Sequence, residues 1–198
     1  VGCGLSYFSA ITDGDDITAQ ITDTGFSTGI AAGATVYVRV EATPELTIAA
    51  SSSMVVNVSA VSQYDSSAVD VVTASTTLTA FYEPDASLKA SAASEYIGAE
   101  IVNIDGNAQI AEADGSPDGA AVYYVQVLNN GNSADPFVVT GATGTDGWSV
   151  VYYDALTGGT DISNNVRGAG WTSGSAAVGA TITFRAEVTP STNIAVDS

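Results

Sequence analysis

Hydrophobic and polar residues alternate along the chain with the period of a β-strand. Residues 36–40 and 182–186 both place apolar side chains at every second position, as half-buried strands do. Runs of Val, Ile, Thr and Tyr are separated by clusters of Gly, Asn, Asp and Pro, and no long stripe of helical period interrupts them. The pattern predicts an all-β protein, and the short spacing of the strands favours a sandwich over an open sheet.

One stretch of sequence occurs twice. Residues 33–44 recur as residues 179–190, and the match continues upstream through the pairs Tyr7-Phe8 with Tyr152-Tyr153, Asp16-Ile17 with Asp161-Ile162, and Gly25-Phe26 with Gly170-Trp171. Arg39 and Arg185 fall at equivalent positions. Hydrophobic, turn and charged positions are all preserved, so the sequence indicates a duplicated module.

The two copies have different neighbours. Strand-like stretches at 54–61 and 68–81 follow the first copy, whereas stretches at 121–128 and 136–140 precede the second. Each module therefore lacks strands that the other has. We place the boundary at the Glu83-Pro84-Asp85 turn, which gives an N-terminal β module at 1–84 and a C-terminal β module at 85–198.

The second half carries a recognisable set of patterns. Residues 129–137 read N-x-G-N-x-x-D-x-F, residues 147–154 read G-W-x-V-x-Y-Y-D, and residues 170–174 read G-W-x-x-G. In these patterns the chain resembles the immunoglobulin-like repeat domains of bacterial and archaeal cell-surface proteins. The resemblance implies immunoglobulin-like β-sandwich modules, one or two, partly duplicated and incomplete without a neighbour. Between two β runs, Asn130-Gly131 is expected to supply the positive φ angles of a tight hairpin.

Charge and composition exclude several functions. The chain has 4 Lys and Arg residues, 22 Asp and Glu residues, no His and a net charge of −18. Without a basic patch we expect neither nucleic-acid binding nor membrane insertion, and no apolar run is long enough for a transmembrane helix. Without His, and with Cys3 as the single cysteine, no catalytic triad or Cys–His pair can form, so we expect no enzyme activity. The scarcity of Lys and Arg favours an exported protein at the cell surface, with its signal peptide removed.

Two groups of side chains are candidates for binding. Acidic residues in two loops could hold Ca²⁺, although neither loop has the twelve-residue calcium pattern and both also suit solvated turns; they are Asp13, Asp15, Asp16, Asp114 and Asp118. No other cofactor is expected. Trp148, Trp171, Tyr152 and Tyr153 could form a sugar-stacking platform, but packing in a core is the better interpretation.

A module without some of its strands leaves an unpaired edge and an uncovered apolar groove. We therefore expect a structural subunit of an extracellular, pilus-like filament, a head-to-tail homopolymer formed by β-strand donation. The N-terminal segment is the preferred donor, because one face carries Val1, Cys3, Leu5 and Tyr7; alternatively it is an ordinary first strand. Two other hypotheses remain: a monomeric adhesin or carbohydrate-binding module, and one phase-shifted unit of a longer repeat array.

Overall fold

The computed structural model describes residues 2–45, 47–117, 119–145 and 147–192. The chain forms two compact units, Val1–Thr79 and Ala80–Ser198, here called unit 1 and unit 2. Every strand pairing is antiparallel. The helices α1 (Thr18–Asp23) and α2 (Ser163–Val166) have six and four residues, so the protein is all-β with helix as a minor element, as the alternation predicts.

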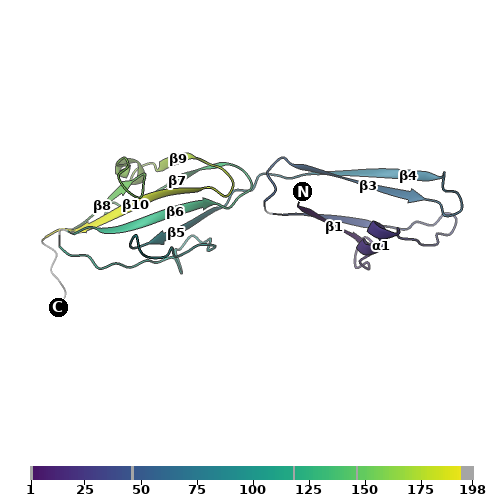
Figure 1. Ribbon diagram of the computed structural model, residues 1–198, viewed down its shortest axis with the longest axis horizontal. Helices are drawn as coiled ribbons and strands as arrows, with labels where there is room; N and C mark the ends of the chain where they lie inside the picture. The colour runs from purple at the N-terminus through teal and green to yellow at the C-terminus, as the bar shows by residue number, and fades with distance from the viewer. Residues whose placement is uncertain (1, 46, 118, 146, 193–198) are drawn as a thin grey trace. The chain divides into compact units, whose positions relative to one another are not determined.

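Unit 2 contains two sheets (Figure 1). The larger has the order β5-β6-β10-β8 and the smaller pairs β7 with β9. Their bounds are β5 Pro84–Lys89, β6 Ala121–Asn129, β7 Asp135–Val139, β8 Trp148–Tyr153, β9 Trp171–Ala176 and β10 Thr181–Pro190. The central strands β6 and β10 are paired on both sides, which is typical of the most protected part of a sheet.

Two hydrophobic clusters form the core of unit 2. The first joins both sheets, because Val127 of β6 and Phe184 of β10 pack with Phe137 of β7 and Ala176 of β9. The second lies at β8 and α2 and consists of Val150, Tyr152, Ile162 and Val166, with Trp171, Ala186 and Val188 packed against it. Unit 2 is thus two sheets that share one apolar interior.

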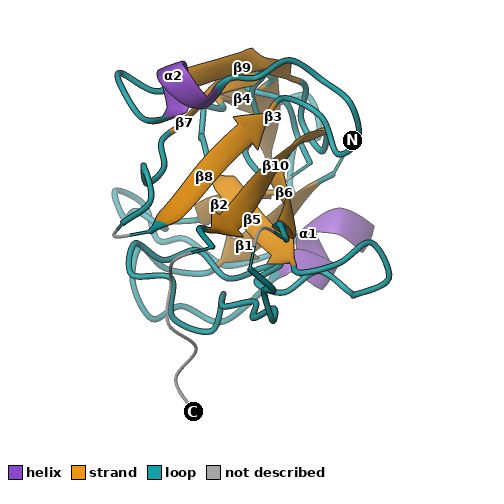
Figure 2. Cartoon of the chain, turned by 90° about the vertical axis from the view of Figure 1, so that its left-hand side faces the viewer, coloured by secondary structure: helices purple, strands orange, loops and turns teal. Residues whose placement is uncertain are grey.

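Unit 1 contains two separate two-stranded sheets (Figures 1 and 2). β1 (Cys3–Phe8) pairs with β2 (Arg39–Pro44), and β3 (Ser53–Val61) pairs with β4 (Val69–Thr77) in a hairpin. Tyr7, Ile17 and Val56 are its buried hydrophobic residues among those described. All nine residues of β4 are exposed. The interior of unit 1 is therefore much smaller than that of unit 2.

The expected turn at residues 83–85 is wrong. Pro84 begins β5, and Asp85 is buried with its Oδ2 accepting a hydrogen bond from the Glu100 backbone N–H at 2.9 Å. Proline suits the first residue of an edge strand because it needs no partner for an N–H group. The division between the units falls a few residues earlier, between Thr79 and Ala80.

The expected tight hairpin at Asn130-Gly131 is also wrong. Neither residue has a positive φ, and β6 and β7 lie in different sheets, so the segment is a corner between sheets. Asn129 holds this corner: its side-chain amide donates to the carbonyl oxygens of Ser133 at 2.8 Å and Ala176 at 2.9 Å. Glycine is needed at 131 because a Cβ there would overlap the Phe81 carbonyl oxygen.

Candidate functional site

The duplicated sequence folds into the same strand pair in both units. In unit 1, β1 and β2 pair from Phe8 with Arg39 to Cys3 with Pro44. In unit 2, β8 and β10 pair from Tyr153 with Arg185 to Trp148 with Pro190. All six pairs in unit 1 have their sequence equivalents in unit 2, so the duplication extends to the register of the sheet.

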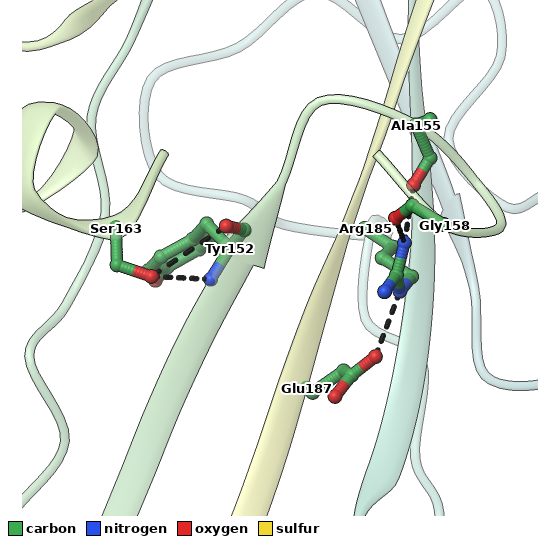
Figure 3. Close-up of polar contacts among 6 residues, drawn as sticks. All are labelled: Tyr152, Ala155, Gly158, Ser163, Arg185 and Glu187. Carbon is green, nitrogen blue, oxygen red and sulfur yellow. Dashed lines mark hydrogen bonds and ion pairs between the residues drawn. The ribbon is translucent and has the colours of Figure 1, made fainter. Parts of the chain in front are cut away.

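The equivalent arginines have equivalent surroundings. In unit 2 the guanidinium of Arg185 lies 3.9 Å from the centre of the Tyr153 ring, and its Nε is 2.8 Å from Oε1 of Glu187. Its Nη1 donates to the carbonyl oxygens of Ala155 and Gly158, which fixes the loop after β8 (Figure 3).

Arg39 repeats this arrangement in unit 1. Its guanidinium lies 4.3 Å from the centre of the Phe8 ring, its Nε is 3.0 Å from Oε1 of Glu41, and its Nη1 donates to the Ile11 carbonyl oxygen at 2.8 Å. Both arginines therefore hold a loop onto the sheet, through a cation–π contact and hydrogen bonds.

The turn before each short helix is also repeated. The Tyr152 N–H donates to Oγ of Ser163 at 2.8 Å, as drawn in Figure 3, and the Ser163 N–H donates to Oδ1 of Asp161 at 2.9 Å. In unit 1 the Tyr7 N–H donates to Oγ1 of Thr18 at 2.8 Å, and the Thr18 N–H to Oδ1 of Asp16 at 2.8 Å. Hydrogen bonds from the Ser163 side chain and backbone N–H hold the pKa of Asp161 below the ordinary value, and those from the Thr18 side chain and backbone N–H do the same for the pKa of Asp16.

Only half of the first hydrophobic cluster of unit 2 has an equivalent in unit 1. The half contributed by the second copy of the duplication comprises Trp171, Ala176, Ala180, Ile182 and Phe184. Phe26, Ala34, Val36 and Val38 are the equivalents of Trp171, Ala180, Ile182 and Phe184, and Ile30 lies in the one-residue-shorter segment that corresponds to 175–178. The other half, on β6 and β7, has no counterpart among the residues that the structure describes in unit 1. We call Phe26, Ile30, Val36 and Val38 the open half-core.

Exposure shows that most of the open half-core is uncovered, since Ile30 is 55% exposed, although Phe26 is partly buried. Val36 and Val38 are each 39% exposed, whereas Phe184, the equivalent of Val38, is 6% exposed. Residues 181–184 are hydrogen-bonded to β6, but the equivalent residues 35–38 belong to no strand. An unpaired edge beside an apolar surface is a template for another β-strand. The candidate site is therefore the edge at residues 35–40 together with the open half-core.

The predicted donor segment lies inside unit 1. Val1 is outside the described residues, and Cys3, Leu5 and Tyr7 are in β1, where each is paired with a residue of β2. Tyr7 is buried and Cys3 and Leu5 are partly buried. This is the position of an ordinary first strand, and donating the segment to a neighbour would break all six pairs with β2.

The described acidic residues predicted to bind Ca²⁺ do not form a metal site. Among the described residues no group of three or more His, Cys, Asp or Glu side chains is arranged to hold a metal ion. Asp13, Asp15 and Asp16 are exposed in the loop after β1, and Oδ1 of Asp16 accepts the Thr18 N–H. Asp114 is exposed in a different unit, and Asp118 lies outside the described residues.

The four aromatic candidates form no common platform. Tyr152 is buried in the second cluster and its hydroxyl donates to the Ala142 carbonyl oxygen at 3.1 Å. Trp171 packs edge-on against Phe184 with 6.3 Å between ring centres, and Tyr153 lies against Arg185. Trp148 is the one of the four that is classed as exposed. Packing within unit 2, and not sugar stacking, accounts for the positions of Tyr152, Trp171 and Tyr153.

The sequence contained the signal for the open half-core. Residues 182 and 184 pair with β6, and the first half of the sequence has no equivalent of β6. The comparison of the two copies therefore predicts that residues 36 and 38 lack a neighbouring strand, and this signal could have identified them as a candidate site. The exposure of β4 had no such signal, because its Val- and Thr-rich sequence is equally typical of a buried strand.

Comparisons with known proteins identify no relative. No family model, no curated protein and no solved structure matches the chain. In the part of the chain that the structure describes, no helix has both the length and the apolar character needed to cross a membrane.

Proposed function

We propose that this protein is a structural subunit of an extracellular, pilus-like filament that grows head to tail by β-strand donation. The observation that carries the proposal is the open half-core of unit 1, which repeats half of a core that is complete in unit 2. A strand from a neighbouring subunit would supply hydrogen bonds to the edge at 35–40 and cover the exposed valines.

The immunoglobulin-like character of the modules is part of this proposal. Unit 2 has two antiparallel sheets that share a core, as β-sandwiches do, and its patterns resemble those of surface-protein repeats. Modules of this kind occur in many cell-surface proteins. Outside the cell, a chain with only 4 Lys and Arg residues offers few cleavage sites to trypsin-like proteases. The supporting features are the fold type, the composition and the unpaired edge.

The energetics are compatible with assembly. Full burial of a Val or Ile side chain contributes about 1.5–3 kcal/mol, so covering side chains that are already half buried contributes about 1 kcal/mol each. The negative charge of −18 on each subunit opposes association, but ionic strength screens it beyond about 8 Å at physiological salt. Assembly should therefore strengthen as salt is added.

Electron microscopy of negatively stained protein tests the proposal. We expect fibres with a subunit-scale repeat from the native chain, and dispersed particles from a Val36→Lys/Val38→Lys variant, because two ammonium groups cannot be buried in the open half-core. A matched control is Val102→Lys/Ile104→Lys, which adds the same charges at exposed positions of unit 2 and should leave fibres intact.

Two outcomes would overturn the proposal. Dispersed particles of the native chain at every protein and salt concentration would favour a monomeric surface protein such as an adhesin. Fibres from the Val36→Lys/Val38→Lys variant that match the native ones would show that assembly does not use this edge.

A further inference from the structure

A donor for the open half-core must be a β-strand with a free edge and exposed apolar side chains. β4 meets this requirement better than any other described strand. Among the strands that the structure describes, β4 pairs only with β3. All nine of its residues are exposed, and Val69, Val71 and Val72 are 52%, 53% and 62% exposed. A long exposed edge without lysine or proline is one that proteins normally cover.

The other described strands are less suitable. β3 has the same length and a free edge, but its Val56 is buried and its Met54 and Val58 are partly buried, whereas all of β4 is exposed. β6 and β10 are paired on both sides, so they can donate nothing without dismantling unit 2. β5 begins with proline and its Leu88 is already bridged to Ile97. β7, β8 and β9 have five or six residues, against nine for β4, and each carries at least one residue buried in the core of unit 2.

The hairpin that contains β4 also has the right topology. In unit 2, β10 is followed across the sheet by β6 and then β5, and these two strands are antiparallel neighbours. The β3–β4 hairpin is likewise antiparallel, and β4 has the same nine-residue length as β6. Adding β4 of a second copy to β2 would give the order β1-β2-β4-β3, which reproduces the order β8-β10-β6-β5.

Charge complementarity indicates the register. Asp70 is the charged residue of β4, and Arg39 is the basic residue at the start of β2. When Asp70 is placed opposite Arg39 in an antiparallel ladder, Val71 lies opposite Val38 and Val69 opposite Val40. Apolar residues then meet on one face, and the ion pair forms on the other.

We propose that β4 of a second copy of this chain is the strand that completes unit 1, with Asp70 opposite Arg39. This inference rests on the proposed function, and it names the donor. In the described part of the chain the acceptor edge belongs to residues 35–40 and the donor edge to β4, so the contact joins unlike segments and is heterologous. Contacts of this type continue from copy to copy and produce an open filament unless the rotation closes a ring.

Complementary variants test the donor. The acceptor variant Val36→Lys/Val38→Lys retains β4, and the donor variant Val69→Lys/Val71→Lys retains the open half-core. We expect each alone to be monomeric, with its self-association weakened at least 100-fold, and an equimolar mixture to stop at a 1:1 heterodimer. Sedimentation velocity distinguishes the monomer, the heterodimer and the native polymer.

A cysteine pair tests the register in the full chain. In a Cys3→Ser background, Tyr37→Cys and Val72→Cys place one thiol on each edge, opposite each other in the proposed ladder. Mild oxidation should then link copies into a covalent ladder on a denaturing gel. The matched control pairs Val102→Cys with Val72→Cys, both on exposed residues, and should give no ladder above background.

The outcomes separate this inference from the proposed function. Fibres from the native chain and from the donor variant, with none from the acceptor variant, would overturn β4 as the donor and leave the filament intact. A heterodimer without the cysteine ladder would overturn the register. Absence of fibres from the native chain would overturn both proposals.

Discussion

At the residue scale, the buried asparagine at the corner of unit 2 explains one of the sequence patterns. Asn129 is 0% exposed, and besides its two donated hydrogen bonds its Oδ1 accepts the Gly131 N–H at 3.1 Å. Asn132 ties the same corner to the preceding segment, because its Oδ1 accepts the Phe81 N–H at 2.7 Å. The two asparagines and the glycine of the N-x-G-N pattern therefore connect three segments of backbone.

Replacing Asn129 with Asp should destabilise unit 2. The substitution keeps the shape but removes the donors to the Ser133 and Ala176 carbonyl oxygens and buries a charge, at a cost of about 3 kcal/mol. Urea unfolding measures the loss. Asn57→Asp, at an exposed position of β3, is the control and should change stability by less than about 0.5 kcal/mol. Equal losses in both variants would contradict the role of the corner.

The carboxylate of Asp161 should make stability depend on acid pH. Hydrogen bonds from Ser163 hold the pKa of Asp161 below its ordinary value. A lowered folded-state pKa means that the contribution is present above the unfolded value of about 3.9 and is lost as the pH falls through the folded-state pKa. The gap in unfolding midpoint between the native chain and Asp161→Asn should therefore shrink between pH 6 and pH 2.5. A gap that stays constant across this range would refute the assignment.

At the scale of single elements, the sequence predicted strands better than it predicted their partners. Alternation predicts strands at both 36–40 and 182–186, but in unit 1 the strand begins only at Arg39, and among the described residues a ladder to a β6-like strand forms only in unit 2. The alternation records which face is apolar, whereas a strand also needs a neighbour for its backbone hydrogen bonds. The missing neighbour could be inferred from the duplication, but the corner at 129–132 could not, because Asn-Gly is equally typical of a hairpin.

Hydrogen exchange should separate the two copies of the duplicated strand. Amides at 181–184 lie in a ladder with β6, so we expect them to exchange at least 100-fold more slowly than the amides at 35–38 in the monomer. Mass spectrometry of peptic fragments makes the comparison within one sample. Similar protection of the two segments in the monomeric acceptor variant would show that the edge is already covered.

At the scale of the whole molecule, the two units should differ in stability. Unit 2 has two hydrophobic clusters, whereas the buried hydrophobic residues described in unit 1 are few. The sequence predicted the division into modules from the unlike neighbours of the duplicated segment. The predicted boundary at 84/85 lies a few residues after the division between Thr79 and Ala80, because Pro84 and Asp85 suggest a turn until the burial of Asp85 is known.

Scanning calorimetry of the monomeric acceptor variant should show two transitions. Val166 is 1% exposed, so Val166→Ala should lower the upper transition by an amount equivalent to about 2 kcal/mol. Ile21 occupies the equivalent position in unit 1 but is only partly buried, so Ile21→Ala should lower the other transition by less. A single transition shifted by both variants would show that the units unfold together.

The positions of the tryptophans determine which unit can be followed by fluorescence. Both tryptophans of the chain, Trp148 and Trp171, lie in unit 2, so intrinsic tryptophan emission reports on that unit while unit 1 is silent. Phe26 is the equivalent of Trp171 in the open half-core. A Phe26→Trp substitution would place a fluorophore in the open half-core. When a donor strand covers the open half-core, the emission of this tryptophan should shift to the blue, so strand binding could be measured in real time.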